Sequence, residues 1–184
     1  MKRILIPVVA VILALLILVP SSVSAYTLLG PKWLSVDPLL YWWNYYDFEE
    51  DPIGLQAWWD SVQDWNGTPT PVNYQWTWGG SQVRLGKAIQ PNAGWDGLST
   101  IHFEGDTIVR VTCAYNWSYT RFYTPNKIRS VTGHELGHSL GLGEMGLGSY
   151  ALMNQFTSGP GSRYDGYGIY TPRQDDINGV NAMY

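Results

Sequence analysis

The sequence predicts an α+β domain in which most strands precede a central helix and the chain after that helix is largely irregular. Three observations indicate this class. Short segments rich in aromatic and β-branched residues occupy much of the region from 39 to 115. A helical pattern over 129–140 follows, and a glycine-rich stretch then runs to about Pro172 before a closing helical pattern. No internal repeat, low-complexity tract or second domain is visible.

The first 25 residues have the pattern of a secretory signal peptide. Lys2 and Arg3 precede an uncharged run of 16 residues from Ile4 to Val19, and Ala25 ends a small-residue sequence suited to cleavage. The run is shorter than the ~18 residues expected of a membrane-spanning helix, so we expect a cleaved signal and a secreted, extracellular protein. An uncleaved N-terminal anchor is the alternative. Residues 26–184 then form one domain with a full-sized core.

Composition narrows the partners that this domain can have. Loss of Lys2 and Arg3 with the signal leaves nine basic and 15 acidic residues, a net charge of −6 without any basic run. This balance argues against nucleic acid as a partner and against a membrane once the signal is removed, and we expect a monomer. Cys113 is the only cysteine, which excludes an intrachain disulfide and is interpreted as a buried thiol in a strand.

The first two elements are predicted from an aromatic run and a capped amphipathic pattern. The apolar run over 39–46 predicts a buried strand. Asp51 and Pro52 have the features of a helix start, and Asn66-Gly67 provides a matching end. Between these signals, apolar residues recur at intervals of three and four and predict the buried face of a helix: Ile53, Leu55, Trp58, Trp59, Val62 and Trp65.

The remaining elements before the central helix are shorter. Partial alternation over 70–78 predicts a strand that ends in a glycine turn. Residues 83–89 are compatible with a strand or a loop, and residues 90–97 are rich in turn formers. Further strands are predicted over 100–103 and 107–115. A last helix is predicted over 174–184, with Asp175 and Asp176 in its first turn, where the helix dipole favours acidic side chains.

A motif within the central helix carries the chemistry. His134 and His138 are four residues apart, so on a helix their imidazoles share one face and can form half of a tetrahedral zinc site. Glu135 can reach a zinc-bound water and take its proton. Gly141 tolerates a positive φ and allows the chain to turn after the helix. Glu144 lies just past that turn, where its carboxylate can return to the same metal.

The extended pattern resembles the metzincin clan of zinc peptidases, whose motif is H-E-x-x-H-x-x-G-x-x-H followed by a methionine-containing turn. Met153, nine residues beyond Glu144, matches that methionine. Residues 26–33, 100–103 and 174–184 are similar to the opening, mid-sheet and closing segments of the matrixins, especially small secreted prokaryotic ones. The resemblance covers most of the chain after residue 25. It implies a metzincin-like fold: a twisted mixed sheet, an active-site helix, a C-terminal helix, a Met-turn and a cleft below an edge strand.

The resemblance also implies a function, that of a secreted zinc metalloendopeptidase. His134 and His138 would bind Zn²⁺, and Glu135 would be the general base that activates the zinc-bound water. The protein or peptide substrate would bind in extended form. It would pair with an edge strand around Ile108-Val109-Arg110-Val111-Thr112, and the segment 154–170 would wall the pocket for the residue after the scissile bond.

The third metal ligand is where the sequence departs from the family. Glu144 occupies the position of the third histidine, and two histidines with one glutamate are an established catalytic zinc set. Asp165 is the rival ligand. His102, far upstream, is interpreted as a structural or surface residue.

The sequence leaves open a second metal, calcium, and a function other than catalysis. Structural Ca²⁺ is common in matrixins, but the aspartates near Asp96, Asp106 and Asp165 are too scattered to define a site. A metzincin-fold protein with a weak or inactive centre, acting as a protein- or glycan-binding module, is the alternative to an enzyme. Asn66 and Asn116 each begin a glycosylation sequon, which is a weak signal.

Overall fold

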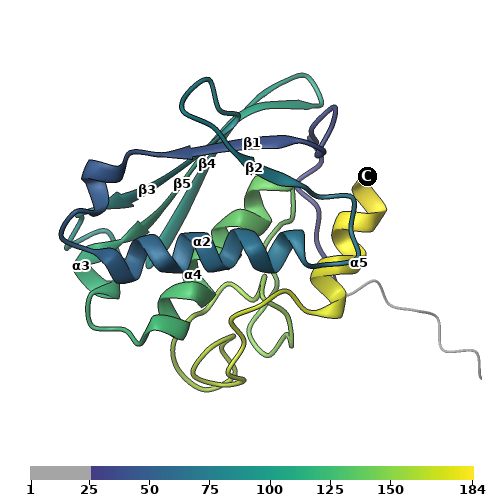
Figure 1. The fold of residues 1–184 in the computed structure, drawn as a ribbon. Helices are drawn as coiled ribbons and strands as arrows, with labels where there is room; N and C mark the ends of the chain where they lie inside the picture. The colour runs from purple at the N-terminus through teal and green to yellow at the C-terminus, as the bar shows by residue number, and fades with distance from the viewer. Residues whose placement is uncertain (1–25) are drawn as a thin grey trace, which may run out of the picture.

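The computed structural model describes residues 26–184, and the signal peptide expected over 1–25 lies outside this range (Figure 1). Five strands form one mixed sheet, β1 (Leu39–Trp43), β2 (Tyr74–Trp76), β3 (Val83–Ala88), β4 (Gly97–Glu104) and β5 (Thr107–Asn116). Their order is β2-β1-β3-β5-β4. The first four pair in parallel, whereas β4 runs antiparallel to β5 and forms one edge of the sheet. The expected α+β class is confirmed at the level of a mixed sheet with packed helices.

Two long helices, α2 (Pro52–Asn66) and α4 (Pro125–Ser139), pack against each other and against the sheet (Figure 1). The chain also forms the short helices η1 (Tyr45–Phe48) and α3 (Trp117–Thr120), and it closes with α5 (Gln174–Met183). Helix α2 begins as predicted, because Asp51 Oδ1 accepts a hydrogen bond from the Gly54 N–H at 3.0 Å. Helix α4 begins before the predicted residue 129, because Thr124 caps it and Pro125 occupies its first turn.

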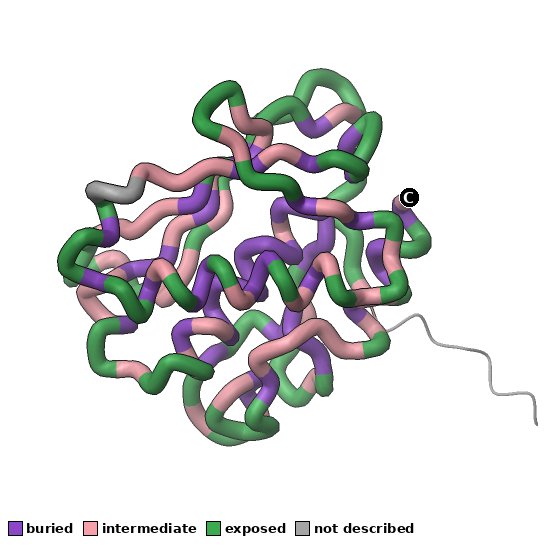
Figure 2. The backbone as a smooth tube through the Cα atoms, viewed as in Figure 1, coloured by how far each residue is buried: buried purple, intermediate pink, exposed green. Residues whose placement is uncertain are grey.

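The core lies between the sheet and the two long helices, where the backbone is mostly buried (Figure 2). Trp58, Val62 and Trp65 of α2 are all 0% exposed, and each contributes roughly 1.5–3 kcal/mol through burial. Both indole N–H groups find backbone acceptors, that of Trp65 at the Gly133 carbonyl of α4 at a distance of 3.0 Å. The predicted apolar face of α2 is only partly right, since Ile53 and Trp59 are 51% and 46% exposed.

Several strand boundaries differ from the predicted ones. The strand expected over 39–46 ends at Trp43, and the chain then turns into η1. Of the segment 70–78, only Tyr74–Trp76 pairs with a neighbour, whereas residues 83–89, compatible with a strand or a loop, form β3. The strand expected over 100–103 extends to Gly97–Glu104, because β5 pairs with it along its whole length. Pairing partners, which local pattern does not reveal, set these lengths.

The two asparagines that begin glycosylation sequons, Asn66 at the end of α2 and Asn116 at the end of β5, form hydrogen bonds within the fold. Gly67 ends α2 with a φ of −80°, so it does not adopt the left-handed conformation usual for a glycine at a helix end. Instead, the Asn66 side chain exchanges two hydrogen bonds with the backbone of Tyr74. Asn116 is 0% exposed, and its side chain makes two hydrogen bonds with the backbone of Gln90: Oδ1 accepts from the Gln90 N–H, and Nδ2 donates to the Gln90 carbonyl. Glycosylation of Asn116 is therefore incompatible with this fold.

The segment between α4 and α5 has no regular structure and is held by side chains. Gly141, with a φ of 88°, turns the chain at the end of α4 as expected. Asp176 in the first turn of α5 accepts hydrogen bonds from the N–H groups of Leu152 and Met153, at 2.8 and 3.0 Å. The C-terminal helix thereby fixes the turn that contains Met153. In the part of the chain that the structure describes, no helix combines the length and the apolar character needed to cross a bilayer.

Candidate metal centre

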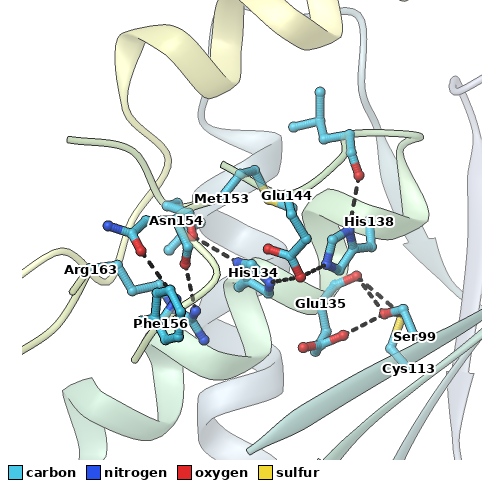
Figure 3. Close-up of polar contacts among 12 residues, drawn as sticks. Ser99, Cys113, His134, Glu135, His138, Glu144, Met153, Asn154, Phe156 and Arg163 are labelled. Atoms are coloured by element: carbon cyan, nitrogen blue, oxygen red, sulfur yellow. Dashed lines mark hydrogen bonds and ion pairs between the residues drawn. The ribbon is translucent and has the colours of Figure 1, made fainter. Parts of the chain in front are cut away.

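Helix α4 and the turn after it bring three potential ligands together (Figure 3). The nearer carboxylate oxygen of Glu144, Oε1, lies 3.2 Å from His138 Nε2 and 3.5 Å from His134 Nε2. One ligand atom of each residue lies within 4.8 Å of the others. Within residues 26–184, no other group of three His, Cys, Asp or Glu side chains has this geometry. His134, His138 and Glu144 could therefore hold a metal ion.

Backbone carbonyls orient both imidazoles. His134 Nδ1 lies 2.9 Å from the Leu152 carbonyl oxygen, and His138 Nδ1 lies 2.9 Å from that of Leu142. Because a carbonyl only accepts hydrogen bonds, each Nδ1 carries a proton in the neutral ring, and each Nε2 presents its lone pair toward Glu144. This outer support is typical of metal-binding histidines, since it fixes the tautomer and the ring plane.

The electrostatics differ among the three residues. Burial lowers the pKa of His134 to about 3, and the nearby positive charge of Arg163 acts in the same direction. Burial also opposes charge on His138, but the hydrogen bond with Glu144 and the charges of Glu135 and Glu144 outweigh it and raise the His138 pKa. The Glu144 pKa lies well below its usual range, because the interactions with His134 and His138 outweigh the effect of burial. Without a metal, the ionised form of Glu144 and the protonated form of His138 therefore favour each other.

Glu135 lies next to this group but points toward the sheet (Figure 3). Its side chain is buried, and Ser99 Oγ on β4 donates a hydrogen bond to Glu135 Oε2 at 2.7 Å. Burial raises the Glu135 pKa, and the Ser99 hydroxyl partly offsets that rise. Gly97 allows this approach, because a Cβ there would stand 2.8 Å from Glu135 Cδ. The result is a carboxyl group with proton affinity above that of an ordinary glutamate.

Met153, the residue expected in a methionine-containing turn, lies against helix α4. Its side chain is 2% exposed and packs against Gly137, between the two histidines along α4. A strand-like bridge between Met145 and Asn154 holds this turn against the segment that carries Glu144. Met153 contacts the helix backbone and does not belong to the group of potential ligands.

An open cleft of about 670 Å³ passes the potential ligands and Glu135. Gly97 to Ser99 and Ile101 of β4 line one side. Residues 155–158 line it from the irregular segment, so part of the region expected to wall a pocket does contribute to it. The cleft therefore runs along an edge strand and beside the potential metal ligands.

The edge strand itself was assigned wrongly from the sequence. Residues Ile108, Val109, Arg110, Val111 and Thr112 lie in β5, which pairs with β3 on one side and with β4 on the other. Val111 and Thr112 pair with β3, and the Ile108 N–H donates to the Lys32 carbonyl at 2.8 Å. On the other side, β4 pairs with β5 and separates it from the cleft, so these residues do not form the free edge. The free edge beside the cleft belongs to β4. A local pattern identifies a strand but not its neighbours, which is why the two halves of this hairpin were confused.

The other candidate residues are separated from the centre or buried as expected. Asp165 forms an ion pair with Lys127 at 2.8 Å and accepts from the Gly159 N–H, away from the ligand group. His102 is exposed on β4. Cys113 is 0% exposed in β5, as predicted, and burial raises the pKa of its thiol.

Two residues of the site had no recognisable signal in the sequence. Ser99 reaches Glu135 only through the β4–β5 register, in which Ser99 stands opposite Cys113. Arg163 lines the cleft but is only 2% exposed, and its Nη1 donates to the Asn154 carbonyl at 2.7 Å. Burial lowers the Arg163 pKa to about 10, so the guanidinium still carries its charge at neutral pH. Isolated serines and arginines in irregular segments give no pattern to detect.

Comparison of the sequence with protein-family models and with curated proteins found no match in either set. The structure by itself defines a mixed α+β domain with one His-His-Glu group that could hold a metal ion. The identity of that metal and the reaction performed at the centre are inferences from its chemistry.

Proposed function

We propose that the protein is a zinc-dependent endopeptidase of the metzincin type, similar to matrixins, that hydrolyses peptide bonds of extracellular proteins. The observation that carries this proposal is the placement of a buried carboxyl group, Glu135, next to the group formed by His134, His138 and Glu144 in one open cleft. The motif spacing, the buried Met153 and the N-terminal pattern of a signal peptide support it.

The ligand chemistry favours zinc over other ions. Two imidazole nitrogens with one carboxylate form a known catalytic zinc set that leaves a fourth position open. Calcium and magnesium prefer oxygen ligands, which this group supplies only through Glu144. The hydrogen bonds from His134 and His138 to carbonyls match the outer support of zinc ligands. The negative charge of Glu144 makes the metal a weaker Lewis acid than a third neutral histidine would.

When bound, zinc polarises a substrate carbonyl and lowers the pKa of a water molecule. The protein's own contribution is to accept and return a proton. Ser99 occupies Glu135 Oε2, so Oε1 is the oxygen that we assign to proton transfer. The raised pKa of Glu135 suits a group that takes a proton from the attacking water and delivers it to the leaving amine.

Strand β4 provides the proposed substrate platform. Among residues 26–184, β4 pairs with β5 alone, and Gly97 to Ser99 and Ile101 line the cleft. An extended peptide that pairs with this free edge would place its backbone across the face of α4 that bears the histidines. Main-chain pairing accepts many side-chain sequences, which fits a protein-degrading enzyme.

A proteolysis assay on the purified protein tests the proposal. We expect cleavage of casein or of a peptide library by the wild type and loss of it in Glu135→Gln, which preserves size but removes the base. Both proteins should bind about one zinc ion per chain, because Glu135 is not a ligand. Equal cleavage by the two proteins would contradict the mechanism. Zinc binding without cleavage by the wild type would favour a non-catalytic binding module.

A matched pair of carboxylate variants tests the ligand assignment. Glu144→Ala should lower zinc affinity by about a hundredfold or more, because it removes one of three ligands. Asp165→Ala should leave zinc affinity unchanged, because Asp165 is paired with Lys127 outside the ligand group. Competition with a chromogenic chelator measures both. The reverse order of effects would transfer the third ligand to Asp165.

A further inference from the structure

The sheet has a second hollow, on the face that does not pack on α2 and α4. Along β3, Val83 and Leu85 face the helices and are only 0% and 1% exposed. Arg84, which lies between them, points to the opposite face and is exposed. A groove of about 460 Å³ lies on this outer face, bordered by the turn between β2 and β3. It shares no lining residue with the cleft of the metal centre. We call it the tryptophan groove; it is lined by Trp42, Trp78, Gly79, Gly80, Ser81, Arg84, Arg110 and Thr112.

Aromatic rings form one part of the tryptophan groove. Trp78 stands at its border with 85% of its surface exposed, and Trp76, itself 38% exposed, supports it edge to face at 4.4 Å between ring centres. Trp42 also lines the groove and is half-buried. Neighbouring exposed indoles make an apolar patch that is unfavourable in water and typical of a binding surface. A flat ring of this kind packs well against the C–H face of a sugar ring.

Two cations form the other part. The Arg84 guanidinium lies over the Trp42 ring at 5.0 Å, and Arg110 lines the same groove from β5. Both are exposed, and neither forms an ion pair with a carboxylate among residues 26–184. A guanidinium presents paired donors that match a carboxylate or sulfate. The groove is therefore a local positive site on a chain that is acidic as a whole.

We propose that the tryptophan groove binds an acidic polysaccharide, with a sugar ring against Trp78 and with carboxylate or sulfate groups at Arg84 and Arg110. The ligand would hold the protein on a glycan surface while the metal-centre cleft stays free. This second site does not depend on the reaction proposed for the metal centre.

The topology and charge favour a glycan over the other anionic polymers. Strands β1, β3 and β5 beneath the groove are each paired on both sides, so an acidic peptide cannot bind there by strand addition. Nucleic acid carries a charge on every phosphate and is held by many cations, whereas this groove has two arginines. An acidic polysaccharide offers both a sugar ring for the exposed indole and acid groups for the two arginines.

Affinity electrophoresis and calorimetry with the purified, metal-depleted protein test this site. The probes are polygalacturonate, alginate and heparin, with dextran, an oligo(dT) and poly-glutamate as competitors of other classes. We expect one or more of the three acidic polysaccharides to bind best, and added salt to weaken the binding. Arg84→Gln and Arg110→Gln should each weaken it about fivefold and Trp78→Ala about tenfold, as expected for a lost charge contact and a lost ring contact.

Arg121→Gln is the matched control, because Arg121 is an exposed arginine over the ring of Phe122 outside the groove and its loss changes the net charge equally. It should bind like the wild type, and thermal unfolding should show that all variants fold. Absence of binding to all three polysaccharides overturns the proposal. So does equal loss in the control, or stronger binding of dextran, oligo(dT) or poly-glutamate, which would assign the groove to that class instead.

Discussion

Replacement of Gly137 by alanine tests how the turn with Met153 supports the metal centre. A Cβ at position 137 would overlap Met153 Sδ and lie 3.3 Å from Met153 Cε and from Trp65 Cζ2. Met153 and Trp65 are 2% and 0% exposed, so neither side chain can move into solvent. Alanine therefore displaces Met153 and, with it, the neighbouring Leu152, whose carbonyl orients His134.

The expected energy follows from two opposing effects. Overpacking a closed core costs about 1–3 kcal/mol. Alanine in place of glycine within a helix returns about 1 kcal/mol. Gly133→Ala isolates the second effect, because its Cβ would meet Leu152 Cδ2 at 3.2 Å and Ser61 Oγ at 3.6 Å, which small shifts relieve. Gly137→Ala should therefore be less stable than Gly133→Ala by about 1–3 kcal/mol.

Urea unfolding of the metal-free protein, followed by tryptophan fluorescence, measures this difference. Met153→Ala should cost less in the Gly137→Ala background than in the wild type, with a coupling energy of about 1 kcal/mol or more, because the overlap is then gone. Metal affinity should also fall more in Gly137→Ala than in Gly133→Ala. Equal stability of the two alanine variants together with additive effects of Met153→Ala would refute the packing argument.

Three further predictions follow from buried polar groups. Asp51→Ala should lower the free energy of unfolding by about 2–3 kcal/mol, since it removes the cap of α2 and the acceptor of the Tyr115 hydroxyl at 2.6 Å. The same substitution should cost less in a Tyr115→Phe background, because no hydroxyl is then left without its acceptor; urea unfolding measures both. The His134 pKa of about 3 is below its unfolded value, so the unfolded metal-free protein binds the extra proton between pH 6.5 and 3. Stability therefore falls as the pH drops through this window, by up to about 1.4 kcal/mol per pH unit. The unfolding free energies of wild type and His134→Gln, measured with urea, should change differently with pH there and run parallel above pH 7. If the protein is the proposed peptidase, Ser99→Ala should shift the acid limb of its pH–rate profile to higher pH, because the hydroxyl stabilises the charged form of Glu135; an unshifted limb would remove Ser99 from the mechanism.

The sequence alone determined the features that depend on spacing within one segment. Asp51 and Pro52 mark the start of α2, and the interval between His134 and His138 places two imidazoles on one face of α4. Gly141 turns the chain with a positive φ, as expected. These predictions succeed because neighbours along a helix or a turn are also neighbours in space, so local geometry suffices.

Only the tertiary structure decided which distant segments meet. It placed Glu144 beside the histidines and Asp165 beside Lys127, although both carboxylates follow the same helix. It put β5 inside the sheet and β4 at its edge, and it brought Ser99 to Glu135. Strand partners and contacts across irregular segments depend on the combined burial of many side chains. That combined burial cannot be inferred from a single stretch of sequence. The surroundings of the His-His-Glu group depend on it, because they are formed by segments that are distant along the chain.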